Sequence, residues 1–172
     1  MAAPFAPIIG STGKIYRNTA TINDPTFGLI PHPNNPTWDL MPNVRDVEVP
    51  IDFTDVDVTS RLGGGFKQHE PALGDLSLSL VMLYNPYDDD MAFLIKAAWL
   101  RLAVELLILD QDRQVNLSQG IRATFKVFKS SRPEKVDGMM EQMFDLKPCW
   151  TQYAPSYVYT ANPLPAPVST NS

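Results

Sequence analysis

Apolar and polar residues alternate with a period of two through the middle of this chain, and this pattern constrains its fold more than any other feature. Successive side chains of a β-strand point to opposite faces, so an alternating segment presents one apolar face to a core. The clearest example is DLSLSLVML at residues 75–83, where serines face away from the side chains of Leu76, Leu78, Leu80 and Met82. We therefore predict a strand here.

Five further segments read as strands. Three alternate cleanly, and their inward faces carry Val47, Val49 and Ile51, then Val56 and Val58, then Ile121, Ala123, Phe125 and Val127. A last strand at about residues 139–147 places Met140, Phe144 and Leu146 on one side. Residues 101–109, RLAVELLIL, are apolar on nearly both faces, which indicates a central strand that is covered on each side. About six antiparallel strands predict a mainly β fold, a sandwich or small barrel of two packed sheets.

One flanking α-helix is predicted at about residues 88–99. A single apolar stripe with helical spacing runs through this segment, formed by Met91, Leu94, Ile95 and Ala98. Asp88 occupies the N-cap position, and Asp89 and Asp90 fill the first turn, where carboxylates satisfy free N–H groups and complement the helix dipole. The alternative is a metal site, but three consecutive residues point in different directions, and a calcium loop would space its oxygens at alternate positions. We interpret the aspartates as a helix start and predict no metal site.

No convincing active site is found in the sequence. The two histidines, His32 and His69, lie in no metal-ligand pair, and no G-x-S-x-G motif occurs. Cys149 reads as a structural or partly buried thiol, and Gly63–Gly65 as a connection between strands because no phosphate-binding motif follows. The tyrosines of residues 152–160 could stack on bases, but without a basic patch we favour edge-strand or interface packing. We expect neither an enzyme nor a bound cofactor.

Composition excludes several classes of protein. A single cysteine leaves no internal disulfide and agrees with folding in a reducing compartment. No run of 18 apolar residues occurs, so we expect no membrane span, and the N-terminus lacks the pattern of a signal peptide. The net charge of −5 argues against nucleic-acid binding, which requires a basic surface.

The charge is unevenly distributed along the chain. Residues 45–90 hold ten acids and three bases, net −7, whereas residues 91–172 hold seven acids and nine bases, net +2. Two readings stay open: the charges simply cover a surface, or they form surfaces of opposite sign on a self-associating subunit.

Prolines cluster near both ends of the chain. Four of the sixteen lie in residues 25–36 and four in residues 155–167, and both segments read as extended loop or arm. We therefore divide the chain into an N-terminal arm with a Pro-rich loop (1–37), a folded domain (38–150) and a Pro-rich C-terminal arm (151–172).

The order of these segments resembles one known family. WDLMPNVRDVEV at 38–49 precedes DVDVTSR at 55–61, a Gly-rich turn with Gly65-Phe66-Lys67, the strand GDLSLSLVMLYNP at 74–86, the short helix, and a strand ending in Leu-Asp at 109–110. This ordered set, over roughly residues 38–148, resembles the major tail tube proteins of tailed bacteriophages. The long Pro-rich arms at 20–37 and 153–172 depart from the family pattern and leave the ring-to-ring contacts undefined.

The resemblance implies a specific function. Members of the family fold as two packed antiparallel sheets with one flanking helix, and six copies form a ring whose inner sheets join into a β-lined channel. Rings stack through loops and terminal arms, and the genome passes down the bore without specific binding. The implied partners are other copies of the chain and further tail proteins, namely the tape measure, the tail terminator and the distal tail or baseplate proteins. The implied location is the virion tail, with the host cytoplasm during assembly and no membrane.

Two other functions stay open. The first is another virion protein on a similar fold, such as a tail terminator, a tube-completion protein or a capsid decoration protein. The second is a carbohydrate-binding or hydrolytic β-sandwich, which requires a concave site with aromatic residues and paired carboxylates. For the tube we expect acids of residues 46–90 to line the bore or to meet bases of residues 122–135 across an interface. The candidate residues are Asp46, Glu48, Asp55, Asp57, Arg122 and Lys126.

Overall fold

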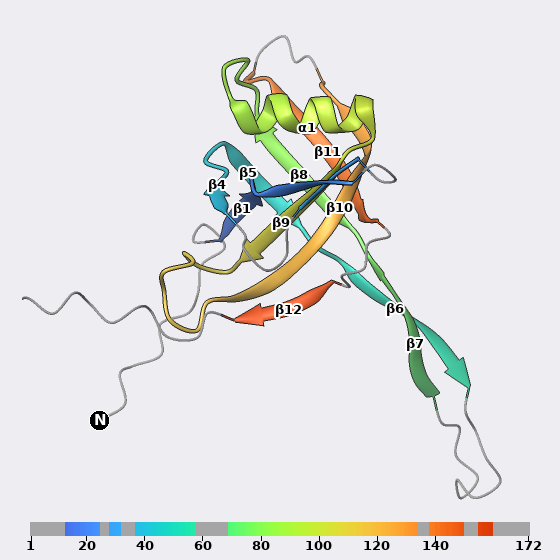
Figure 1. Cartoon of the computed structure of the whole chain (residues 1–172). Coiled ribbons are helices and arrows are strands. Elements are labelled where there is room, and N and C mark those ends of the chain that lie inside the picture. Colours follow the sequence, from blue (N-terminus) through green and yellow to red (C-terminus); the bar gives the residue numbers. More distant parts are fainter. Residues whose placement is uncertain are drawn as a thin grey trace, which may run out of the picture.

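The fold is mainly β, with one helix, as the alternation predicts (Figure 1). The computed structural model describes residues 13–24, 28–31, 37–57, 69–133, 138–149 and 155–159. The helix is α1 (Asp89–Leu100). The strands in these ranges are β1 (Lys14–Asn18), β2 (Thr21–Asp24), β3 (Gly28–Pro31), β4 (Trp38–Leu40), β5 (Val44–Glu48), β6 (Ile51–Asp57), β7 (His69–Leu76), β8 (Leu78–Leu83), β9 (Ala103–Leu109), β10 (Gln119–Ser131), β11 (Glu141–Pro148) and β12 (Ser156–Tyr159).

Eight strands form one antiparallel sheet. Its order is β4-β1-β9-β10-β11-β8-β5, and β12 pairs with β10 off this path. The pairs β2–β3 and β6–β7 form two separate two-stranded ribbons. The predicted antiparallel sandwich or barrel is therefore built on one continuous main sheet.

The main sheet curls so that its two ends come close together. β4 and β5 lie at opposite ends of the strand order, yet only residues 41–43 separate them in the chain, a span of at most ~15 Å. The Met41 N–H donates to the Ile15 carbonyl (2.9 Å), and the Leu83 N–H donates to the Asn43 carbonyl (3.0 Å). This short connection thus joins β1 to β8 and closes much of the sheet around one core.

The interior of the curled sheet holds that core. The most deeply buried side chains come from β8, β9, β10, β11 and α1, and include Leu78, Leu80, Met82, Leu94, Leu106, Phe125, Phe144 and Leu146. Burying one such side chain contributes roughly 1.5–3 kcal/mol. The inward faces predicted for β8, β10 and β11 are confirmed.

β9 is buried on both faces, as its continuous apolar sequence predicts. Leu106 faces the main core, while Leu107 and Leu109 form a second cluster with Tyr16, against which Trp38 and Val158 pack. The second cluster lies on the outer face of the sheet and is covered from β4 and β12.

The helix differs in detail from its prediction. It begins one residue later than expected, and its deepest stripe is Met91, Leu94 and Ala97, with Ile95 and Ala98 only half-buried. It ends at Leu100 because Arg101 adopts a left-handed conformation (φ 56°) and donates its N–H to the Ala97 carbonyl. In Figure 1, α1 lies across one end of the curled sheet. No helix in the described part of the chain is long and apolar enough to cross a membrane.

Other expectations need correction. Val47 lies on the core side of the sheet, opposite Leu80, as predicted, but it is 40% exposed because β5 ends the sheet. Ile51 is 47% exposed because β6 leaves the sheet. Two segments assigned to arms are strands of the main sheet: residues 14–18 form β1, between β4 and β9, and residues 156–159 form β12. Both are too short to show a clear alternation. The arm assignment stays a prediction for the remainder, much of which lies outside the described residues.

Candidate assembly surface

The three consecutive aspartates have separate structural roles. Asp88 Oδ1 accepts hydrogen bonds from the backbone N–H groups of Asp90 (2.8 Å) and Met91 (3.2 Å), and Asp88 Oδ2 accepts one from Asn43. Asp90 pairs with Arg17, and Asp89 is exposed. The predicted N-cap at Asp88 is confirmed.

The structure describes only some of the residues considered for metal or thiol chemistry. In the described ranges, no three His, Cys, Asp or Glu side chains gather as metal ligands. Cys149 is half-buried, and burial raises the pKa of its thiol, which keeps it protonated at neutral pH. His32, the His69 side chain and Gly63–Gly65 lie outside the described residues.

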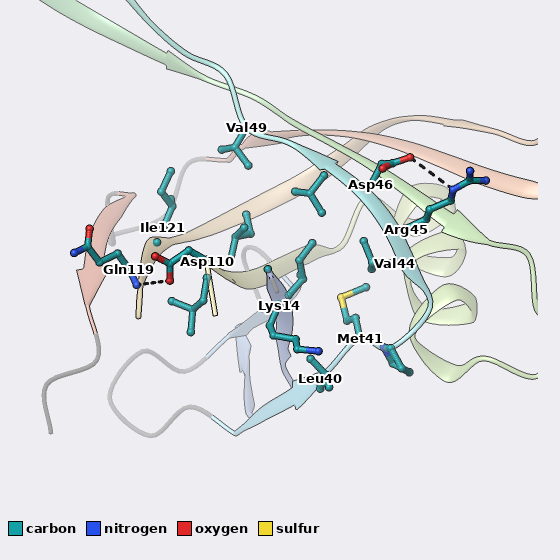
Figure 2. Close-up of a pocket in the computed structure, with 17 residues that line it drawn as sticks. Lys14, Leu40, Met41, Val44, Arg45, Asp46, Val49, Asp110, Gln119 and Ile121 are labelled. Atoms are coloured by element: carbon teal, nitrogen blue, oxygen red, sulfur yellow. Dashed lines mark hydrogen bonds and ion pairs between the residues drawn. The ribbon is translucent and has the colours of Figure 1, made fainter. Parts of the chain in front are cut away.

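A groove of about 910 Å³ opens between β5 and the neighbouring ends of β1, β9 and β10. Figure 2 shows Val44 and Val49 on the β5 side, with Lys14, Asp110 and Ile121 across the space. Its lining includes the carboxylates of Asp46 and Asp110 but no aromatic residue. A carbohydrate site would require aromatic platforms, so this groove does not suit that alternative.

The outer face of four consecutive strands, β5-β8-β11-β10, carries a gradient of charge. The register places Asp46 opposite Val81, and Glu48 opposite Ser79, on the face away from the core. Between β8 and β11, Ser79 lies opposite Asp145. Between β11 and β10, Asp145 lies opposite Lys129, and Lys147 lies opposite Lys126. The acids Asp46 and Glu48 therefore lie at the β5 side of this face, where Arg45 pairs with Asp46 and with Glu141. The lysines lie at the β10 side, where Lys129 pairs with Asp145.

Both sides of this four-strand unit have unpaired backbone edges. β5 pairs with β8 on one side, and no described strand pairs with its other side. β10 extends beyond the end of β9. Its residues 120–126 pair with β9, whereas on the same side Phe128–Ser131 pair with no strand in the described ranges. Such edges are templates for pairing with another chain.

The structure places the six predicted residues in three regions. Asp46 and Glu48 are exposed on β5, and Asp55 and Asp57 are exposed on β6. Arg122 and Lys126 lie on the outer face of β10. Within one copy the predicted acids do not meet the predicted bases, so a contact between them remains a prediction about two copies.

Arg122 is already engaged within its own chain. Its Nε lies 2.5 Å from Glu105 Oε1, and its guanidinium carbon lies 5.3 Å from the centre of the Trp38 ring. Glu105 is buried and also accepts a hydrogen bond of 2.5 Å from Asn18 Nδ2. Arg122 therefore helps to hold β1, β4, β9 and β10 together.

The sequence analysis included Lys129 only within the bases of residues 122–135 and did not single out Asp145. Strict alternation would place Lys126 and Lys129 on opposite faces, but a β-bulge between Val127 and Lys129 shifts the register and brings both to the outer face. Lys129 Nζ then lies 3.9 Å from Asp145 Oδ2. No sequence signal marks this bulge.

The β6–β7 ribbon extends away from the curled sheet (Figure 1). It exposes Phe53 by 61% and places Asp52, Asp55 and Asp57 in solvent. A two-stranded ribbon is at most marginally stable by itself. An exposed aromatic ring on such a ribbon suits a contact with another molecule.

Known structures with the same architecture come from phage-like tails and injection systems. A chain of the virion of a native gene transfer agent particle matches with a TM-score of 0.60 at 13% identity, over 89% of this chain and 98% of that one. The SPP1 tail tube matches with a TM-score of 0.61 at 11% identity, over 91% and 80%. This chain has the tail-tube fold. A chain of the PVC sheath–tube complex, from an extracellular contractile injection system, matches with a TM-score of 0.56 at 11% identity, over 91% and 93%.

These likenesses concern the fold. No protein-family model matches the chain, and no curated protein matches its sequence. The fold expected from the resemblance to tail tube proteins is confirmed, because the matches span nearly the whole chain on both sides.

Proposed function

We propose that the chain is a structural subunit of a phage tail tube, which associates with its own copies into stacked six-membered rings and catalyses no reaction. The observation that carries this proposal is the pair of open edges, of opposite charge, on the two sides of the β5-β8-β11-β10 unit. The shared tail-tube fold supports it.

The strand directions suit a closed ring. Neighbouring strands in the unit are antiparallel throughout, so β5 runs opposite to β10. In a ring, β5 of one copy then meets β10 of the next as an antiparallel neighbour, and four strands per copy continue the alternation around the ring. Each junction satisfies backbone groups on both edges, which is the usual benefit of closing a sheet.

Charge favours this order of contact. The Asp46 and Glu48 carboxylates of one copy would approach Lys129 and its neighbour Lys126 on the next. Exposed ion pairs contribute little free energy, typically 0.2–1 kcal/mol each, but they set orientation and suppress wrong pairings. Arg122 is less suited to this role because Glu105 already holds it.

We assign the β6–β7 ribbon to contact between stacked rings. The ribbon projects from the sheet and exposes Phe53, so it can reach a neighbouring copy (Figure 1). DNA passing through the bore would bind nonspecifically at most, because the chain carries a net charge of −5 and repels phosphates. The proposed location is the virion tail, reached after assembly in the host cytoplasm with the tape measure, terminator and baseplate-type proteins.

Reversing the charges on each edge, and then mixing the two reversed variants, tests the proposal. We would express the full chain, the acid variant Asp46→Lys/Glu48→Lys and the base variant Lys126→Glu/Lys129→Glu, and measure mass by light scattering and shape by negative-stain microscopy. We expect tubes or sixfold rings from the natural chain, monomers from each variant, and rings again when the variants are mixed, since every junction then pairs opposite charges. Lys96→Glu on the exposed face of α1 serves as the control and should assemble normally.

Three outcomes would overturn the proposal. If both charge variants assemble like the natural chain, these edges are not the junction. If the natural chain remains monomeric even with preformed tube seeds, self-association into a tube is excluded. A single closed ring that does not stack would instead point to a terminator or tube-completion protein.

A further inference from the structure

The loop between β9 and β10, residues 110–118, is held in place by hydrogen bonds within the subunit. Asp110 Oδ1 accepts a hydrogen bond from Ser118 Oγ (3.0 Å), and Ser118 is fully buried. The Arg113 N–H donates to the hydroxyl of Tyr16 on β1 (3.0 Å). These contacts fix the loop to the sheet at both of its ends and in its middle, so its conformation is already formed in the single subunit.

Leu117 adopts a backbone conformation in this loop that is unfavourable for leucine. Its φ is 65°, in the left-handed region. The Ser118 N–H donates to the Val115 carbonyl (3.4 Å), so Leu117 is the third residue of a turn, where a positive φ normally requires glycine or asparagine. The Cβ of other residues is crowded in this region. Glycine or asparagine would therefore form the same turn with less strain.

The fold buries little of the Leu117 side chain. It is 62% exposed and belongs to neither apolar cluster of the described residues, and Val115 is 41% exposed beside it. Strained backbone persists where the surrounding structure imposes it, and it gathers at sites of function. A leucine that is both strained and exposed contributes little to the stability of the single subunit. Its side chain instead suits a contact with another molecule.

Leu117 lies at one rim of the β5-β8-β11-β10 unit. It is two residues before Gln119, the first residue of β10. Because β5 runs opposite to β10, the end of β5 lies at this same rim, and the β6–β7 ribbon that we assign to contact between rings also leaves from here. In Figure 1 the β9–β10 loop lies on the side of the sheet away from α1.

The opposite rim of the unit exposes an aromatic ring. Tyr87 lies four residues after the end of β8, in the turn before α1, and is 92% exposed. This turn is also held in place, because Asn85 Oδ1 accepts a hydrogen bond from the Tyr87 N–H (3.1 Å), and the Asp88 N–H donates to the Asn85 carbonyl (3.1 Å). Each rim therefore presents an exposed apolar side chain on a preformed turn.

Rings built from this unit would stack rim against rim, because its strands run from one rim to the other. Complementary surfaces at opposite ends of a subunit join copies head to tail and generate open stacks. We propose that Leu117 packs on Tyr87 of a second copy in the next ring, and that the strained turn holds the leucine for this contact. This inference rests on the proposed function. β8 and β10 are two strands apart, roughly 10 Å, an offset that a rotation between rings accommodates.

Replacing Leu117 by asparagine separates stacking from folding. Asparagine tolerates a positive φ but has no apolar side chain. We expect the melting temperature of the dilute, unassembled subunit to stay level or to rise by up to about 4 °C, because strain is relieved. The tube mass in sedimentation should fall by about tenfold or more, because each junction loses a buried leucine, while single rings persist in negative-stain images. Leu100→Asn at the end of α1, where the leucine is 58% exposed, is the matched control and should form normal tubes.

Several outcomes of this experiment would overturn the inference. A clear fall in the melting temperature of Leu117→Asn would show that the leucine serves the fold. Tubes of natural length from Leu117→Asn, or an equal loss of tubes from Leu100→Asn, would remove the proposed contact and leave the proposed function intact. A natural chain that forms rings without stacks would also remove it, and a natural chain that forms no rings would remove the proposed function as well.

Disulfide trapping tests the partner of Leu117. In a Cys149→Ser background, Leu117→Cys is combined with Tyr87→Cys, or with Leu100→Cys as the control. A disulfide requires the two Cα atoms to approach to about 4.4–6.8 Å. Within one subunit the six residues of β8, roughly 20 Å in length, separate the two rims, so only cysteines of different copies can react.

Mild oxidation of assembled tubes should give a ladder of covalent multimers on non-reducing gels from the Tyr87→Cys combination, and monomers from the control. A variant that does not assemble alone is mixed with an equal amount of the Cys149→Ser chain, and covalent dimers then replace the ladder. Tubes without this crosslink, or with equal crosslinking in the control, would overturn the inference by showing that Leu117 meets a different surface.

Discussion

Arg17 of β1 and Asp90 of α1 form the ion pair that ties the helix start to the first strand. Arg17 Nε lies 2.7 Å from Asp90 Oδ1, and the guanidinium carbon lies 4.5 Å from the centre of the Phe93 ring. Both side chains are largely buried, at 13% and 11% exposure. Burial raises the pKa of Asp90, and the hydrogen bond from Arg17 opposes that rise. One arginine therefore both compensates a buried carboxylate and packs on an aromatic ring.

Replacing Arg17 by methionine should destabilise the fold strongly at neutral pH. The change leaves Asp90 buried without its cation, and removing one partner of such a pair typically costs about 3–5 kcal/mol when burial is complete, so we expect about 2–3 kcal/mol here. Urea denaturation measures this loss. Adding Asp90→Asn should recover much of the stability, because the uncompensated charge is then absent. Equal stability of the single and double variants would contradict this account.

The same pair predicts a dependence on pH. Because the folded-state pKa of Asp90 lies above its ordinary value, the folded state binds this proton first as the pH falls. The contribution of Asp90 to stability therefore decreases as pH rises from the unfolded-state pKa through the folded-state pKa. In Arg17→Met the folded-state pKa rises further, so the variant's deficit relative to the natural chain should shrink when unfolding is measured at pH 4 in place of pH 7. A deficit that does not change with pH would exclude Asp90 as its origin.

The N-cap predicts a contrast between two neighbouring aspartates. Asp88→Ala removes the acceptor for two backbone N–H groups and for Asn43, and should cost about 1–2 kcal/mol of unfolding free energy. Asp89→Ala removes only an exposed charge in the first turn and should cost less than about 1 kcal/mol. Chemical denaturation of both variants checks the order. A larger loss from Asp89→Ala would be inconsistent with Asp88 as the cap.

We expect the fold to tolerate alanine at Gly74 but not at Gly120. A Cβ on Gly120 would lie 1.7 Å from the Ile108 carbonyl oxygen, so the β9–β10 backbone would have to shift. Overpacking of this kind costs roughly 1–3 kcal/mol or more. A Cβ on Gly74 would approach only the ring of Phe53, at 3.0 Å, and this exposed ring can move. Melting temperatures should fall clearly for Gly120→Ala and little for Gly74→Ala; similar shifts would contradict the close approach of β9 and β10.

Substitution of Arg122 should lower the stability of the subunit, whereas substitution of Lys129 should affect only its assembly. Arg122→Ala leaves Glu105 buried without that ion pair and should destabilise the free subunit by about 2 kcal/mol. Lys129→Ala removes an exposed lysine 3.9 Å from Asp145 and should change subunit stability by less than about 0.5 kcal/mol while slowing ring formation. Thermal unfolding and light scattering together measure both effects. A stable Arg122→Ala, or a Lys129→Ala that assembles at the natural rate, would contradict the respective assignment.

Much of the local structure could be predicted from the residues alone. Alternation identified β8, β10 and β11 and their inward faces. The continuous apolar run identified β9 as a strand that is buried on both faces, and Asp88 identified the start of α1. These features depend on interactions within a few residues, namely the period of a strand, the covered faces of a central strand, and the free N–H groups of a first turn. The order of such segments also sufficed to suggest the tail-tube fold.

Only the tertiary structure decided how these elements join. β1 and β12 lie in segments that were assigned to arms on the basis of Pro-rich sequence, and their place in the sheet depends on partners distant in sequence, β9 and β10. The closure of the sheet through residues 41–43 and the bulge that puts Lys129 beside Asp145 likewise arise from pairing between distant strands. Sequence alone determined which faces are apolar and where the helix starts. The tertiary structure decided which edges remain open, because strand order and register depend on long-range backbone hydrogen bonds that the local pattern of side chains does not specify.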